Sequence, residues 1–144
     1  MNKTAGKEII LNASAIALKN KGVLIIGPSG SGKSTLAIEM LSLGATLIAD
    51  DQTVLVEKPD GLYLNPLQNN AGLIEARFVG IMKITWQKCV KLSTVVDLSK
   101  EETKRLPPFR TYKLLNHKFP CIYAKGNKFI AKALYVLFAG ERIH

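Results

Sequence analysis

Residues 27–34 read Gly27-Pro28-Ser29-Gly30-Ser31-Gly32-Lys33-Ser34, which satisfies the pattern G-x-x-x-x-G-K-[ST] in full. Before this stretch, Val23 to Ile26 form a branched apolar run, the pattern of a strand buried on both faces. After it, apolar residues recur at helical spacing from Leu36, and Gly44 is placed to end the helix. A strand, a glycine-rich loop and a helix in this order predict a phosphate-binding loop.

The residue types in this loop suit the phosphates of a nucleoside triphosphate, taken here as ATP with Mg²⁺. Glycines let consecutive backbone N–H groups point inward, and the start of the helix directs its positive dipole end at the same anion. The Lys33 ammonium reaches the β- and γ-phosphates, and the Ser34 hydroxyl is a hard oxygen suited to Mg²⁺. The alternative is a flexible Gly/Ser loop that matches the pattern by accident. Its place between a buried strand and an amphipathic helix favours nucleotide binding by all eight residues, 27–34.

Two adjacent carboxylates, Asp50 and Asp51, follow the next apolar run, Thr46 to Ala49. A strand, a helix and a strand so close together predict a right-handed parallel crossover, in which both strands end at the same edge of the sheet. Asp50 and Asp51 would then lie beside the loop at Gly27. A turn or helix-cap role is the alternative for such a pair. In the site, one carboxylate could hold Mg²⁺ and the other could take a proton from an attacking hydroxyl.

A third candidate element is the segment from Leu73 to Arg77. In an extended chain, Glu75 and Arg77 project to the same side and offer a carboxylate near the metal and a cation for phosphoryl charge. Taken alone, the segment favours a surface ion pair on a strand over a role in the site.

Length and composition indicate one soluble domain over residues 1–144, and the strand, helix and strand pattern makes its class α/β. The chain has a hydrophobic share of 47% and a formal net charge of +9, and the charges are spread rather than packed into a basic run. We therefore expect phosphate ligands or an acidic protein partner, and no nucleic-acid or membrane function. The first ten residues lack a signal-peptide layout, and the two cysteines lack metal-type spacing, so we expect a cytoplasmic protein with reduced thiols.

Beyond Asp51 the chain changes to short extended runs separated by turns such as Pro59-Asp60-Gly61. The segment from Lys100 to Pro108 is polar and then broken by proline, and we interpret it as a mobile excursion. The segment from Phe129 to Phe138 fits a helix or a strand. These patterns predict a P-loop on a mixed β-sheet with flanking helices, not a regular series of βαβ units.

Several of these motifs together resemble the kinase domain of HPr kinase/phosphorylase, the bacterial enzyme that phosphorylates a serine of the phosphocarrier protein HPr. The resemblance rests on LNASA at residues 11–15, GPSGSGKS at 27–34, LIADD at 47–51 and GLIEARFVGI at 72–81. It covers residues 9–98 well and the rest loosely. The length matches a short form that contains only the C-terminal kinase domain.

The resemblance implies a fold shared with phosphoenolpyruvate carboxykinase, an ATP-dependent serine kinase activity, HPr as the substrate, phosphorolysis as a reverse reaction and a hexameric assembly. It also implies roles for the candidate residues. Asp51 would be the general base, with Lys33 and Arg77 as its catalytic partners. The residues near Mg²⁺ would be Ser34, Asp50 and Glu75.

Two positions depart from the family pattern. Asn12 stands where the family usually has a histidine, and Phe78 follows the arginine where a glycine is common. Two other functions remain open: a P-loop kinase or NTPase that acts on another acceptor, and a non-catalytic, ATP-sensing regulatory protein. The region after Lys100, where acceptor-contacting loops should lie, is the part that would distinguish them.

Overall fold

The centre of the fold is β3 (Lys21–Ile26), the strand that leads into the phosphate-loop sequence. The computed structural model describes residues 6–144. Residues 1–5 lie outside the described residues. They begin both the domain predicted over 1–144 and the N-terminal segment that we expect to lack a signal peptide. Along β3, Val23 and Ile25 pack into one buried cluster and Leu24 into another. Both faces of the strand are covered, which explains the unbroken apolar run.

A tight hairpin joins β3 to the preceding strand, β2 (Ser14–Leu18). The two turn residues, Lys19 and Asn20, have φ angles of 52° and 64°. Positive φ at both central positions is the turn geometry that matches the twist of antiparallel strands. β2 and β3 therefore form an antiparallel hairpin that leads into the central strand of the sheet.

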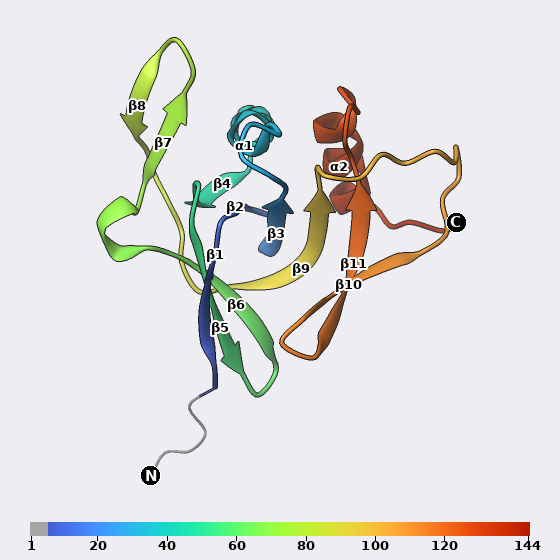
Figure 1. Cartoon of the computed structure of the whole chain (residues 1–144), viewed down its shortest axis with the longest axis horizontal. Coiled ribbons are helices and arrows are strands. Elements are labelled where there is room, and N and C mark those ends of the chain that lie inside the picture. Colours follow the sequence, from blue (N-terminus) through green and yellow to red (C-terminus); the bar gives the residue numbers. More distant parts are fainter. Residues whose placement is uncertain (1–5) are drawn as a thin grey trace.

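The helix α1 (Lys33–Ser42) connects β3 to β4 (Thr46–Ala49). β4 pairs antiparallel with β2, and β2 pairs antiparallel with β3, so β3 and β4 run in the same direction with β2 between them. The predicted common direction is confirmed, although the two strands are not neighbours, because the hairpin strand β2 takes the place between them. Their carboxyl ends still lie at one edge of the sheet, where α1 begins (Figure 1).

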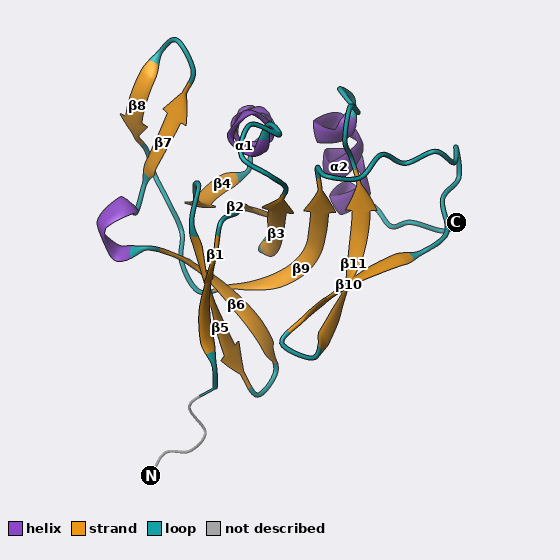
Figure 2. Cartoon of the chain, viewed as in Figure 1, coloured by secondary structure: helices purple, strands orange, loops and turns teal. Residues whose placement is uncertain are grey.

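The rest of the chain is mainly short strands. The other elements are β1 (Glu8–Leu11), β5 (Thr53–Lys58), β6 (Gly61–Pro66), the 3₁₀ helix η1 (Gln68–Asn70), β7 (Leu73–Ala76), β8 (Gly80–Lys83), β9 (Val90–Asp97), β10 (Arg110–Leu114), β11 (His117–Tyr123) and α2 (Ile130–Ala139). The segment from Phe129 to Phe138, whose sequence fits a helix or a strand, forms the helix α2 (Figure 2).

β9 joins the two halves of the nine-stranded sheet, whose order is β1-β5-β6-β9-β3-β2-β4, with β11 and then β10 attached at β9. The start of β9 pairs antiparallel with β6, and its later part pairs in parallel with β3 and β11. The strand curves strongly between these partners (Figure 1). The sheet therefore contains both parallel and antiparallel pairs, and the predicted mixed α/β architecture is confirmed.

Two buried clusters stabilise this arrangement, one on each side of the central strands. Both helices, α1 and α2, pack into the same cluster, with Met40 and Leu134 among their buried residues. The second cluster lies between the curled half of the sheet and the central strands, and includes Leu24, Leu55 and Leu64. The helices thus cover one face, and the loop between β3 and α1 emerges at the edge of that face.

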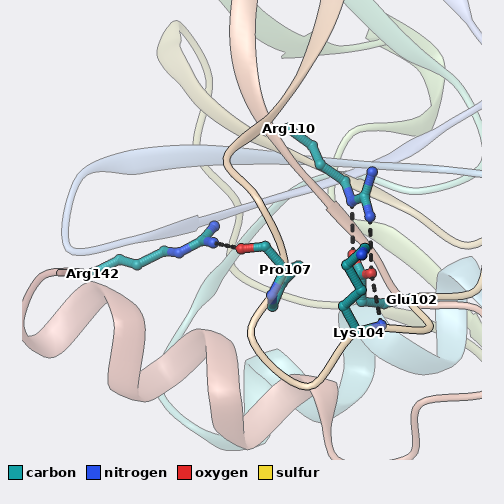
Figure 3. Close-up of polar contacts among 5 residues, drawn as sticks. All are labelled: Glu102, Lys104, Pro107, Arg110 and Arg142. Carbon is teal, nitrogen blue, oxygen red and sulfur yellow. Dashed lines mark hydrogen bonds and ion pairs between the residues drawn. The ribbon is translucent and has the colours of Figure 1, made fainter. Parts of the chain in front are cut away.

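Residues 99–109, between β9 and β10, contain neither helix nor strand, as the polar and proline-rich sequence predicts (Figure 2). The segment is nonetheless tied to the fold, because Arg110 donates two hydrogen bonds to the Glu102 carboxylate at 2.7 and 2.9 Å (Figure 3). The same guanidinium lies 4.4 Å from the ring centre of Tyr123. At the C-terminal end, Arg142 donates to the Pro107 carbonyl. The predicted mobility of the segment stays a prediction.

Among the described residues, no helix combines the length and the apolar character needed to cross a bilayer. Both cysteines are free, with Cys89 exposed and Cys121 buried. Burial, reinforced by the nearby Asp97 charge, raises the pKa of the Cys121 thiol to about 11. This thiol is therefore protonated at neutral pH and behaves as an apolar core group.

The Glu102–Arg110 ion pair makes the stability of the fold depend on pH. Hydrogen bonds from Arg110 lower the pKa of Glu102 from 4.5 to about 2. A carboxylate with a lowered folded-state pKa contributes stability above its unfolded pKa and loses it as the pH falls toward the folded value. We expect Glu102→Gln to lower the thermal unfolding midpoint at neutral pH and to weaken its fall between pH 4.5 and pH 2. Thermal scans across this range test the expectation, with Glu101→Gln, an exposed neighbour, as the control.

Candidate functional site

The loop between β3 and α1 has the backbone that its glycines allow. Gly27, Gly30 and Gly32 have φ angles of 152°, 81° and 99°, values that L side chains rarely adopt. A Cβ atom at Gly30 or Gly32 would meet nothing within 4 Å, so these two glycines are required by backbone conformation and not by crowding. The Ser31 N–H donates to the Pro28 carbonyl at 3.0 Å and closes the loop into a turn.

The helix α1 begins directly at this loop and presents an uncapped N-terminus. The first intrahelical bond runs from the Leu36 N–H to the Gly32 carbonyl at 2.9 Å, and no side chain caps the helix. Its first turn holds no acidic residue. Unpaired N–H groups and the positive end of the helix dipole therefore face the loop, which is the arrangement that attracts a phosphate group.

Lys33 places a positive charge over the same loop. Its ammonium donates hydrogen bonds to the carbonyls of Gly27 at 2.8 Å and Pro28 at 3.1 Å. These carbonyls hold the charge at the mouth of the loop, where an anion bound to the backbone amides would meet it. The position suits the contact with terminal phosphates that the motif predicts.

The Asp50 carboxylate, which follows β4, accepts hydrogen bonds from three other elements. One of its oxygens accepts hydrogen bonds from the Ser34 hydroxyl at 2.7 Å and the Ser14 hydroxyl at 2.9 Å. Its other oxygen accepts from the Glu75 N–H at 3.4 Å. Since these donors come from α1, β2 and β7, the carboxylate after β4 fixes the positions of all three around the loop.

Asp51 has a different environment from its neighbour. Its φ of 71° breaks the extended chain, so the two carboxylates are not placed by simple strand alternation, as an extended segment would require. Its side chain is exposed and lines the cavity beside the loop. In the described part of the chain, no side-chain or backbone donor is paired with its carboxylate; only its N–H contacts Ser14, at 3.4 Å. Asp51 is thus free to act on a ligand.

The cavity next to the loop has a volume of about 660 Å³, within the range of small-molecule sites. Of the residues proposed from sequence, Asp51, Glu75 and Arg77 line it together with the loop. Its full lining is Asn12, Gly27, Pro28, Ser29, Gly30, Gly32, Lys33, Ser34, Thr35, Ile38, Asp51, Glu75 and Arg77. Ser31 and Asp50 are the two proposed residues that do not line the cavity. A second cavity, of about 410 Å³, lies between residues 102–110, β11 and α2 and contains none of the predicted site residues.

The donors at the cavity are suitable for Mg²⁺ but do not form a ready-made metal cage. Across residues 6–144, no cluster of three or more His, Cys, Asp or Glu side chains is placed to hold a metal ion. Mg²⁺ commonly keeps several waters and binds through one or two carboxylates plus substrate phosphates. The Ser34 hydroxyl and the Asp50 carboxylate, already within 2.7 Å of each other, offer hard oxygens of this kind.

Ser14 is a site residue that the sequence analysis did not assign. It is fully buried, and its hydroxyl donates to Asp50 while accepting from the Asp51 N–H. A buried hydroxyl inside an otherwise apolar strand is the signal that could have singled it out, since such a group needs a partner. Asn12, two residues earlier, is exposed and lines the cavity, so the position that departs from the family histidine lies at the site.

Comparisons with known proteins agree with this geometry. The profile of the family described as HPr Serine kinase C-terminal domain matches residues 3–105. The HPr kinase/phosphorylase of Stenotrophomonas maltophilia is 33% identical over 113 residues, which cover 73% of this chain and 36% of the relative. That of Clostridium botulinum is 32% identical over 106 residues, which cover 74% and 34%. The chain thus spans about a third of the length of these curated relatives.

A solved structure with the same fold is that of the HPr(Ser) kinase/phosphatase from Coxiella burnetii. It matches with a TM-score of 0.78 and 21% sequence identity, over 91% of this chain and 88% of the other. At this identity the likeness concerns the fold. The predicted resemblance to the HPr kinase family is confirmed.

The hydrogen bonds of Ser14 predict a measurable loss when its hydroxyl is removed. Because a buried hydrogen bond to a charged group contributes about 1.5–3 kcal/mol, Ser14→Ala should lower the free energy of unfolding by an amount of this order. Ser42→Ala is the control, since that hydroxyl is exposed and bonds only the Glu39 carbonyl. Urea unfolding of both variants tests this, and equal stabilities would contradict the bridging role of Ser14.

Proposed function

This chain belongs to the family of HPr serine kinase C-terminal domains, and from that premise we propose that it is an ATP-dependent protein serine kinase with HPr as its acceptor. The observation that carries the proposal is the cavity itself. It joins a complete phosphate loop, an uncapped helix N-terminus and the free carboxylate of Asp51 in one space. Because the chain spans about a third of its curated relatives, activity and acceptor both require a direct test.

Nucleotide binding is assigned to residues 27–34. The backbone amides of the loop and of the first turn of α1 bind the β-phosphate, and Lys33 exchanges its carbonyl contacts for the β- and γ-phosphates. Mg²⁺, held by Ser34 with Asp50 and with Glu75 nearby, would neutralise charge on the phosphate oxygens. Asp50 also keeps Ser34 in place through the 2.7 Å hydrogen bond.

Transfer is assigned to Asp51 and Arg77 with Lys33. Asp51 accepts the proton of the acceptor serine, whose oxygen forms a bond to the γ-phosphorus as the bond to the bridging oxygen breaks and ADP leaves. Arg77 lines the same cavity and offers a cation suited to charge on the transferred group. In phosphorolysis, the reverse reaction implied by the family, Asp51 would return a proton to the serine oxygen.

The proposed nucleotide binding predicts that the Lys33→Ala variant binds ATP more weakly. Removing the ammonium takes away the one side-chain cation contributed by the loop, so ATP affinity should fall by about tenfold or more. Titration of nucleotide in the presence of Mg²⁺ measures the change, with Lys21→Ala, an exposed lysine at the far end of β3, as the control. Unchanged affinity in Lys33→Ala would remove the phosphate-loop assignment.

The chemical half predicts that Asp51→Asn abolishes phosphoryl transfer while ATP still binds. An amide cannot take the serine proton, and general-base catalysis contributes about 10²–10⁴-fold to rate. The measurement uses labelled ATP, Mg²⁺ and HPr, and repeats the reaction with HPr whose acceptor serine is replaced by alanine. Label on the first HPr and not the second supports the acceptor assignment. Transfer by Asp51→Asn at the wild-type rate would exclude its role as base.

Two other functions have distinct signatures in the same assay. Rapid ATP hydrolysis without any protein would indicate an NTPase or a kinase with another acceptor. Tight ATP binding with no turnover, with or without HPr, would indicate a nucleotide-sensing regulator. The single domain over 1–144, the hexamer implied by the family and the cytoplasmic location stay predictions, and sedimentation of the purified chain measures the assembly directly.

A further inference from the structure

The hairpin of β7 and β8 stands apart from the main sheet. Among the strands of residues 6–144, these two pair only with each other, and the hairpin projects from the body of the molecule on the side of α1 (Figure 1). One of its faces packs inward: Ile74 is 2% exposed, and its cross-strand partner Met82 packs against the same cluster. The buried face anchors the hairpin and leaves its opposite face and its tip outside the core.

The opposite face belongs to the cavity. Glu75, which lines the cavity, lies directly across from Ile81 in the hairpin register. Directly opposed residues in an antiparallel pair project to the same side, so Ile81 lies next to Glu75 on the outer face. Arg77, at the end of β7, also lines the cavity. The hairpin therefore forms part of the cavity wall and continues beyond it.

That continuation is apolar. Phe78, Val79 and Ile81, here called the apolar rim, are 101%, 76% and 73% exposed, and Phe78 directly follows Arg77. A side chain as large as phenylalanine gains nothing from full exposure to water. Adjacent exposed apolar side chains beside a polar cavity are characteristic of a surface that another molecule covers.

The backbone of the rim is strained as well. Phe78 has a φ of 70°, in the left-handed region, which is uncommon for a bulky residue and costs about 1–2 kcal/mol. Glycine would occupy this position without that cost. The Val79 N–H donates to the Ala76 carbonyl at 2.9 Å, so the positive φ of Phe78 belongs to the tight turn at the hairpin tip. The exposure of its aromatic ring, in contrast, has no benefit within residues 6–144.

We propose that the apolar rim is the docking surface for the protein acceptor of the phosphoryl group. The proposal rests on the proposed kinase function and adds the partner's chemistry: an apolar patch beside the acceptor serine. A folded protein that delivers a hydroxyl to Asp51 must approach the cavity wall formed by Glu75 and Arg77, and the rim continues that wall outward. The formal net charge of +9 favours an acidic partner.

Phe78→Gly is the sharpest test because it removes the ring and relieves the backbone at once. The variant should fold at least as stably as the wild type. We expect affinity for HPr, with its acceptor serine replaced by alanine, to fall by about tenfold, the effect of an aromatic anchor at an interface centre. With phosphorylatable HPr, KM should rise by a similar factor, while ATP affinity stays unchanged.

A matched pair of valines controls for general surface effects. Val79, in the rim, and Val136, on α2, are 76% and 67% exposed. Val79→Ser should weaken HPr binding, whereas Val136→Ser should not. Equal effects of the two substitutions would contradict a specific rim.

Each remaining outcome decides between named alternatives. If wild type and Phe78→Gly bind and phosphorylate HPr equally, the rim inference fails and the kinase function stands. If the wild type binds ATP but neither binds nor phosphorylates HPr, the proposed function fails, and HPr docking at the rim fails with it.

If the Phe78→Gly substitution instead changes the sedimentation of the protein alone, the rim contacts a second copy. If it abolishes binding to vesicles of phosphatidylserine and phosphatidylcholine, the rim contacts a membrane; either result overturns the proposal.

Discussion

The site depends on the hydrogen bonds that converge on one carboxylate. Asp50 accepts from Ser34 in α1, from Ser14 in β2 and from the N–H of Glu75 in β7. A partly buried carboxylate needs several donors to offset the loss of its hydration, and here the donors come from three separate elements. The need of the Asp50 carboxylate for hydrogen-bond donors thus fixes the end of β4, the start of α1 and the β7–β8 hairpin relative to one another. The cavity is the space between them.

This convergence gives adjacent aspartates different chemistry. Asp50 accepts hydrogen bonds at both oxygens and is not among the cavity-lining residues. Asp51 has a φ of 71° and lines the cavity with a carboxylate that accepts no hydrogen bond from residues 6–144. Strand alternation alone would have sent the two side chains to opposite faces of the sheet. The left-handed backbone at Asp51 instead leaves the Asp50 carboxylate hydrogen-bonded between elements and places Asp51 in the cavity lining.

Local sequence predicted the parts of the site that are built from neighbouring residues. The loop, the start of α1 and the common direction of β3 and β4 follow from a short strand, loop and helix pattern, and Asp50 and Asp51 follow from that direction. Long-range contacts could not be predicted in the same way. Apolar alternation does not say which strands pair, so the insertion of β2 between β3 and β4, and with it the bridging role of Ser14, needed the structure. The separation of the β7–β8 hairpin from the main sheet is a further case.

Positive φ angles in this chain occur mainly at turns, and two of the residues concerned lie at the cavity or beside it. Within residues 6–144, seven non-glycine residues have positive φ: Lys19, Asn20, Asp51, Phe78, Cys89, Leu115 and Asn116. Two pairs of them close two-residue hairpins, where the turn type demands this conformation. Phe78 belongs to the turn at the tip of the β7–β8 hairpin, which the Val79 N–H closes on the Ala76 carbonyl at 2.9 Å, and Cys89 directly precedes β9. Asp51 lines the cavity, and Phe78 directly follows Arg77, which also lines it. Strain persists where the surrounding structure over-determines it, as the donors to Asp50 and the buried face of the hairpin do here. Two of the residues with positive φ, Asp51 and Phe78, are thus held with exposed side chains at the cavity and beside it.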